Sequence, residues 1–348
     1  MSSSTGYGPT TRHSPRFWEA ERRLIAALLA GLGTALLAGV ALGPYPLTPG
    51  QVISVLAGDR SDPQAAIVLF NIRLPRVLAA ALVGAALAAA GAAYQTVFRN
   101  PLVSPDILGV SAGAGFGAVL GILLGLPVMA IQMLGFAAGL GTVALVLGLT
   151  MALRGAGQVL VMVLCGIAIG ALAGAGISLV KLLADPEQQL PAITFWLMGS
   201  LAGAKRVDVA AALPAIVVGL VPLMLWRWRI GLLSMGEDEA RALGVEVGRL
   251  RLLVITCATL MTAAAVAMAG VIGWVGLMVP HMARLVTGPR FDRLLPAALL
   301  VGAAFMVLVD TAARMIATQE VPLGILTSVL GAPIFVWLLA RGARPWSE

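Results

Sequence analysis

Long runs of apolar residues constrain this chain more than any other feature of its sequence. A helix that crosses a bilayer needs about 20 mainly apolar residues, because the hydrocarbon core is about 30 Å thick. Eight runs have this character, at residues 24–42, 77–97, 128–153, 159–180, 209–226, 252–270, 294–309 and 325–340. Two shorter, glycine-rich runs, 107–126 and 271–285, bring the expected number of spans to ten. Only 11% of the residues are charged, against about a quarter in soluble proteins. The sequence therefore predicts an all-α, polytopic integral membrane protein with about ten transmembrane helices.

The lysines and arginines predict which side of the membrane each loop occupies, because cytoplasmic loops carry an excess of them. If the chain starts in the cytoplasm, sixteen of its 23 basic residues fall on the inner side. The other seven lie at or near the outer side: Arg60, Arg73, Arg76, Lys181, Lys205, Arg206 and Arg314. We therefore expect both termini in the cytoplasm, with tails at 1–21 and 344–348 around a membrane domain at 22–343.

A charged stretch, GEDEARALGVEVG at 236–248, lies in the longest inner loop, between the sixth and seventh spans. It holds four of the sixteen acids of the chain. The acids at 237–239 suit the first turn of a helix, where the helix dipole favours negative charge. Ala240 and Leu243 would share one helix face, and Gly244 suits a left-handed C-cap. So short a helix is marginal alone in water. We interpret it as a docking element for a cytoplasmic partner; the alternative is a solvated loop with helical turns.

Two regions of the membrane domain carry helix-breaking residues. One helix should run from Pro75 through Val97 and stop at Asn100-Pro101, since the residue before a proline disfavours the α conformation, and it should restart after Pro105. The glycine-rich segment 269–280 predicts a tightly packed and broken helix.

The sequence offers no catalytic constellation. It has no phosphate-binding G-x-x-x-x-G-K-[ST] pattern, and Cys165 and Cys257 lie in different apolar runs without ligand-like spacing. We expect no cofactor and no metal, and we interpret His281 as a packed or capping residue. Asp310 and Arg314 lie four residues apart near the outer end of the ninth span. An acid within the membrane suggests a functional site such as a proton relay, but this spacing favours a local ion pair.

Several ordered motifs resemble one family of membrane proteins. They are RLPR from 73, RNPLVSPDILGVSAGAG from 99, FWLMGSL from 195, GEDEARALGV from 236, GVIGWVGLMVPHMARLV from 270 and DTAARMIATQEVPLGILTSVLGAPIFVWLL from 310. Together they resemble the FecCD-type permeases, the membrane subunits of bacterial binding-protein-dependent ABC importers for iron-siderophores, haem and cobalamin. The resemblance covers essentially the whole chain beyond the N-terminal tail. It implies a multi-pass permease of the bacterial inner membrane, and not an enzyme, because a separate subunit hydrolyses ATP.

The resemblance also implies partners and contact residues. The partners are two copies of a cytoplasmic ATP-binding subunit, a periplasmic or surface substrate-binding protein, and a second permease subunit, either a copy of this chain or a relative. Segment 236–250 would form coupling helices that touch the ATPase through Glu237, Asp238, Glu239, Arg241, Ala242, Leu243 and Gly244. Arg73, Arg76 and Arg314 would pair with acidic residues of the binding protein. Helices 159–180 and 325–340 would line the transport path, and the loop 154–158 would form an inner gate.

The predicted function is ATP-driven import of a ferric siderophore. A large iron chelate needs a wide, mostly apolar path, which the Ala-, Gly- and Leu-rich helices 159–180 and 325–340 allow, although they allow haem or cobalamin equally. An ion-coupled secondary transporter is the less favoured alternative. Such a transporter would have buried ionisable residues in addition to Asp310, and it would not account for the acidic inner helix.

Overall fold

The computed structural model describes residues 15–341, apart from 46, 60, 154–156 and 318. All regular elements in this part of the chain are helices. In chain order they are α1 (Pro15–Ala41), α2 (Pro49–Leu56), α3 (Pro63–Ile67), the π-helical turn η1 (Val68–Arg73), α4 (Leu74–Val97), the 3-10 turn η2 (Pro105–Leu108), α5 (Val110–Leu123), α6 (Val128–Ala152), α7 (Gln158–Leu183), α8 (Gln189–Leu197), α9 (Arg206–Leu225), α10 (Arg227–Leu232), α11 (Glu237–Ala242), α12 (Val247–Ala269), α13 (Val275–Thr287), α14 (Phe291–Met315) and α15 (Leu323–Arg341).

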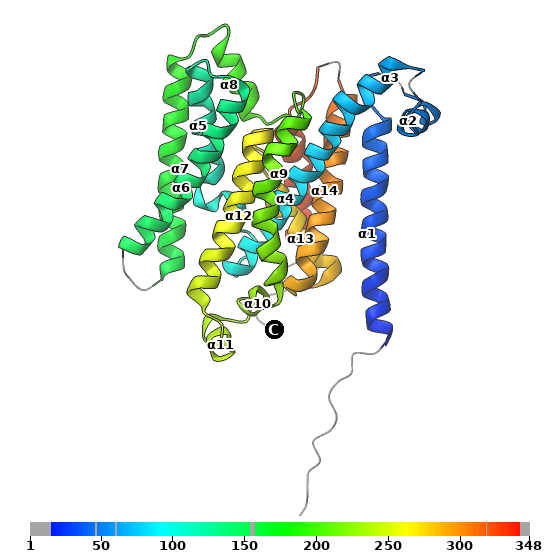
Figure 1. The fold of residues 1–348 in the computed structure, drawn as a ribbon. Coiled ribbons are helices and arrows are strands. Elements are labelled where there is room, and N and C mark those ends of the chain that lie inside the picture. Colours follow the sequence, from blue (N-terminus) through cyan, green and yellow to red (C-terminus); the bar gives the residue numbers. More distant parts are fainter. Residues whose placement is uncertain (1–14, 46, 60, 154–156, 318, 342–348) are drawn as a thin grey trace, which may run out of the picture.

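The long helices form one bundle whose two ends carry different short helices (Figure 1). Helices α2, α3 and α8 lie at the upper end of the view, whereas α10 and α11 lie at the lower end, where α1 begins. Helix α1 stands at one edge of the bundle, and α6 and α7 stand at the opposite edge. The start of α1 and the charged segment therefore lie at the same end of the bundle, as the distribution of basic residues predicts.

The predicted all-α, multi-span architecture is confirmed. Seven of the described helices are long and apolar enough to cross a membrane, and two shorter apolar helices, Val110–Leu123 and Leu323–Leu338, accompany them. These nine correspond to nine of the ten predicted spans. The remaining prediction, 271–285, falls on α13, which begins only at Val275 because residues 270–274 are not helical. The break expected between 269 and 280 is therefore present.

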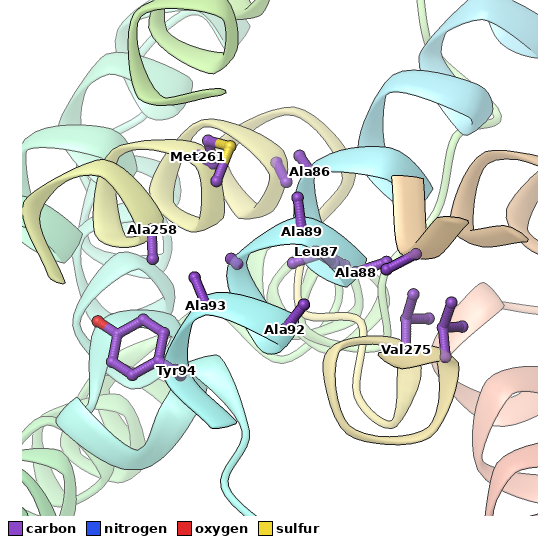
Figure 2. Close-up of a cluster of buried hydrophobic side chains, with 14 of the residues drawn as sticks. Ala86, Leu87, Ala88, Ala89, Ala92, Ala93, Tyr94, Ala258, Met261 and Val275 are labelled. Atoms are coloured by element: carbon purple, nitrogen blue, oxygen red, sulfur yellow. The ribbon is translucent and has the colours of Figure 1, made fainter. Parts of the chain in front are cut away.

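Helix α4 forms the centre of the subunit. Its alanines are almost all buried, and Figure 2 shows several of them packed toward Met261 and Ala258 of α12 and toward Val275 of α13. Small residues let helix backbones approach one another closely. At Gly84, an added Cβ would overlap the carbonyl group of Gly302 in α14. Close backbone contact therefore holds this core together, with few large side chains.

The chain turns sharply after α4. The sequence predicts a helix through Val97 with a stop at Asn100-Pro101, and α4 does end at Val97. The chain leaves the helix there because Arg99 adopts the left-handed conformation, with φ of 51°. The Asn100 N–H then donates to the Gln95 carbonyl at 3.1 Å, which closes the helix as a Schellman motif. The restart after Pro105 is confirmed by η2 and α5.

Candidate functional sites at the two ends of the bundle

The charged segment at the lower end of the bundle in Figure 1 contains the short helix α11. Its C-terminus is closed by a complete Schellman motif: the Gly244 N–H donates to the Arg241 carbonyl at 2.9 Å, and the Val245 N–H donates to the Ala240 carbonyl at 3.0 Å. Gly244 has φ of 80°, a conformation that glycine adopts without steric cost. The left-handed C-cap predicted at Gly244 is therefore present.

Ion pairs form within α11 and between α11 and the next long helix, α12. Arg241 contacts Glu237 at 2.7 Å and Asp238 at 3.0 Å within the segment. Glu237 also accepts a hydrogen bond from Arg251 of α12. This hydrogen bond, together with the charges of Arg251 and Arg241, lowers the pKa of Glu237 below its ordinary value. Because these groups are partly exposed, the pairs orient α11 more than they stabilise the fold.

Ala240 and Leu243, which are predicted to share one helix face, differ in exposure. Ala240 is fully buried against its own subunit, whereas Leu243 is 60% exposed. Leu243 is the C-cap residue and lies just after the last helical residue, Ala242. Met235, just before α11, is also exposed. Met235 and Leu243 therefore leave exposed apolar side chains on both sides of the charged helix α11.

Buried charges cluster at the opposite end of the bundle. Asp310 of α14 is fully buried and contacts two arginines: Arg76 of α4 at 2.9 Å and Arg314 at 3.2 Å. Arg76 also contacts Glu320, in the loop before α15, at 2.7 Å. The local Asp310–Arg314 pair predicted from the spacing is confirmed. We call these four residues the outer charge network.

Two of the predicted docking arginines bind the end of α1. Arg314 donates to the carbonyl groups of Gly39 and Leu42 at 3.0 and 3.1 Å. Arg73 donates to the carbonyls of Val40 and Ala41 at 2.7 Å. The last carbonyl groups of a helix lack partners within the helix, and these guanidinium groups supply them. The arginines therefore join the end of α1 to η1 and α14.

The family resemblance implies that Arg73, Arg76 and Arg314 lie at an exposed docking surface, but the structure buries all three. Their exposed fractions are 3%, 5% and 6%. Sequence reasoning missed Glu320 and the α1 carbonyl groups as their partners. The concentration of arginines and acids near the outer ends of two spans was the available signal. Docking of a binding protein through these arginines stays a prediction, whereas their internal contacts are observed.

The other residues singled out from the sequence lie apart from these two sites. His281 is half-buried in α13, Cys257 is buried in α12, and Cys165 is half-buried in α7. Of the loop proposed as an inner gate, 154–156 fall outside the described residues, and α7 begins at Gln158. Helices α7 and α15, proposed to line the transport path, both present exposed apolar side chains, including Leu164 and Val329.

Comparison with known proteins places this arrangement in one family. The model of the FecCD transport family matches residues 28–341. The chain belongs to the FecCD transport family. It is the permease subunit of an ABC importer, a multi-pass inner-membrane protein that works with an ATPase and a substrate-binding protein, and it is not an enzyme. Because an ATPase works with the permease, the family explains why the chain has no phosphate-binding sequence pattern of its own.

The relatives differ in what they import. The chain is 39% identical over 308 residues to the molybdate import system permease protein MolB of Haemophilus influenzae, covering 86% of this chain and 91% of that protein. It is 37% identical over 330 residues to the Fe(3+)-citrate import system permease protein YfmE of Bacillus subtilis, covering 93% and 97%. Other relatives are named for cobalamin and hemin. Among solved structures, an ABC transporter assigned to the metal-chelate type, in an inward-facing conformation, is similar to this chain, with a TM-score of 0.84 and 37% sequence identity. The match covers 92% of this chain and 99% of that chain.

Proposed function

We propose that this permease imports a ferric siderophore. It would act as a homodimer or with a related permease, with two copies of the ATPase and with both termini in the cytoplasm. Haem and cobalamin are the alternative cargoes, and molybdate is the cargo of one relative. The relative named for Fe(3+)-citrate and the neighbour of the metal-chelate type support the iron chelate.

The exposed face of α7 is the observation that favours a large chelate over a small oxyanion. Its exposed residues are mainly leucine, isoleucine and alanine, among them Leu164, Ile167 and Leu172. Lys181, in the last turn, is the one charged residue of this helix. A small dianion needs cations or N–H donors to replace its water, whereas a large chelate surrounds its metal with its own ligands and tolerates an apolar wall.

Leu243 carries the proposal that α11 transmits ATPase movement. A leucine that is 60% exposed at the tip of an ion-paired, capped helix can fill an apolar groove on a partner. The acids at 237–239 and Arg241 would surround it as a polar rim. ATP binding would then move α11 and α12 together, because the hydrogen bond between Glu237 and Arg251 links the two helices. The ATPase would have to contact α11 differently in the two states, since equal contact would shift neither.

The contacts within the outer charge network determine which internal ion pair we propose that the binding protein breaks. Arg76 and Arg314 are satisfied inside the subunit, so an acid of the binding protein must replace an internal partner. Glu320 is the network member that reaches the surface, with a 34% exposed side chain. We propose that the binding protein displaces Glu320 from Arg76. Glu320→Gln should then tighten capture of the binding protein at low salt, and Arg76→Gln should weaken it. If Glu320→Gln leaves capture unchanged in a titration, this competition is absent.

Reconstitution tests the transport proposal. The permease, its ATPase and its binding protein would be placed in proteoliposomes, and uptake of ⁵⁵Fe-siderophore, haem, cobalamin and ⁹⁹Mo-molybdate would be measured with and without ATP. We expect ATP-dependent uptake of the ferric siderophore alone. Uptake driven by an ion gradient without the ATPase would contradict the importer mechanism. Uptake of molybdate or another cargo in place of the siderophore would contradict the substrate only.

A further inference from the structure

Helix α1 packs tightly against the bundle only near its outer end. There, Ala35 and Gly39 are buried, and an added Cβ at Gly39 would meet Val307 of α14 and Val77 of α4 at 2.9 and 3.0 Å. Between residues 22 and 34 the structure describes no buried side chain. An added Cβ at 31 or 33 would meet no atom within 4 Å. The inner half of α1 therefore packs less closely against its neighbours than the outer half, although Leu28 contacts the core.

A groove of about 400 Å³ lies between this inner half of α1 and α14. Its apolar walls come from residues spaced three and four apart, so that each helix contributes one face. They are Leu24, Ile25 and Leu28 of α1 and Pro296, Ala297 and Leu300 of α14. Helix α1 crosses the membrane and stands at the edge of the bundle opposite α7 (Figure 1). The groove is therefore open to a lipid-facing edge, on the side away from the proposed transport path.

The inner mouth of the groove is positively charged. Arg227, the first residue of α10, and Arg293, in the first turn of α14, both line it. Asp292 also lines it, but Arg290 contacts its carboxylate at 2.9 Å and offsets that charge. Trp226 and Trp228 flank Arg227 and are 38% and 65% exposed, as indole groups commonly are at the membrane interface. These observations place the mouth at headgroup level, with cationic groups facing it.

We propose that this groove binds an anionic phospholipid of the inner leaflet, with an acyl chain against α1 and α14 and the phosphate at Arg227 and Arg293. Basic pockets between transmembrane helices on the inner side suit anionic headgroups. The apolar walls below the two arginines suit an acyl chain. A soluble anion has no apolar part that would occupy this portion of the groove. Bound lipid fills the space that α1 leaves open and holds its inner half in register with α14. This site is independent of the transported substrate.

Native mass spectrometry of the purified full-length chain tests the site. The protein would be titrated with dioleoyl-phosphatidylglycerol, and separately with dioleoyl-phosphatidylcholine, which has the same chains and no net charge. We expect tighter binding of the anionic lipid. Arg227→Gln should weaken that binding about fivefold, the size expected for one interfacial arginine. The matched control Arg229→Gln, on the same helix but outside the groove, should change it less than about twofold.

A steric pair tests the acyl-chain part separately. Leu28→Trp fills the groove and should weaken binding of both lipids, whereas Leu29→Trp, at a 52% exposed neighbouring position that does not line it, should weaken neither. Equal binding of the two lipids, or equal effects of the two arginine variants, would overturn the headgroup assignment. Equal effects of the two tryptophan variants would overturn the groove assignment. Displacement of the lipid by millimolar inorganic phosphate would show a site for free anions and would also overturn the proposal.

Discussion

Removal of the Asp310 carboxylate tests whether the outer charge network is a structural element of the subunit. Asp310 is fully buried and is shared by Arg76 and Arg314. Removing one partner from a buried ion pair typically costs 3–5 kcal/mol, because the remaining charge stays buried without compensation. Here Arg76 keeps Glu320 at 2.7 Å, and Arg314 keeps two α1 carbonyl groups. We therefore expect Asp310→Ala to lower the free energy of unfolding by about 3 kcal/mol, the lower end of that range.

Two further variants should lower the free energy of unfolding by smaller amounts than Asp310→Ala. Asp310→Asn keeps the shape of the side chain and one acceptor oxygen, so it should cost about 1.5 kcal/mol. Glu320→Gln removes a pair whose acid is 34% exposed and should cost about 1 kcal/mol or less. The measurement is reversible unfolding of the purified chain in mixed micelles, followed by circular dichroism as the denaturing detergent fraction rises. The reasoning would be refuted if Asp310→Ala cost no more than Glu320→Gln.

Two other variants test the core and the inner helix. Gly84→Ala should destabilise the chain by about 1–3 kcal/mol, because the added Cβ overlaps the Gly302 carbonyl. Gly141→Ala, where an added Cβ meets no atom within 4 Å, should be neutral or slightly stabilising in the same unfolding assay. Equal effects of the two variants would contradict the close contact of α4 and α14. The lowered pKa of Glu237 predicts that its stabilising contribution is present above pH 4.5 and lost as the pH falls through the lowered value. The difference in melting temperature between the wild-type chain and Glu237→Gln should therefore vanish in acid, and a difference independent of pH would rule out the pair with Arg251 as its source.

The sequence predicts the elements that depend on local properties. Hydrophobic length is a property of a single segment, so all ten predicted spans correspond to helices, including the break before α13. The C-cap at Gly244 is also local, since a left-handed residue ends a helix wherever it stands. The end of α4 at Val97 agrees with the prediction, but the proline rule does not reveal how the helix is closed. Arg99 takes the left-handed position there, which the proline at 101 does not predict.

Partners distant in the chain could not be predicted in the same way. Arg314 bonds to the carbonyl groups of Gly39 and Leu42, which lie 275 and 272 residues away in the sequence. No motif records which carbonyl groups a distant helix end leaves free, so the buried position of the arginines emerges only from the packing of α1, α4 and α14. The exposure of Leu243 likewise depends on its place at the C-cap, which the spacing of apolar residues does not reveal.

Co-purification of the ATPase with Leu243→Asp tests the central claim, coupling through α11, most directly. Leu243 is 60% exposed, so the substitution leaves the isolated permease folded but puts a charge where the claim places an apolar groove of the partner. Leu124→Asp is the control, since Leu124 is 62% exposed just beyond α5, at the opposite end of the bundle. Burying an unpaired carboxylate should outweigh the contact, so Leu243→Asp should lose the ATPase while Leu124→Asp retains it. Retention of the ATPase by both variants would contradict the account.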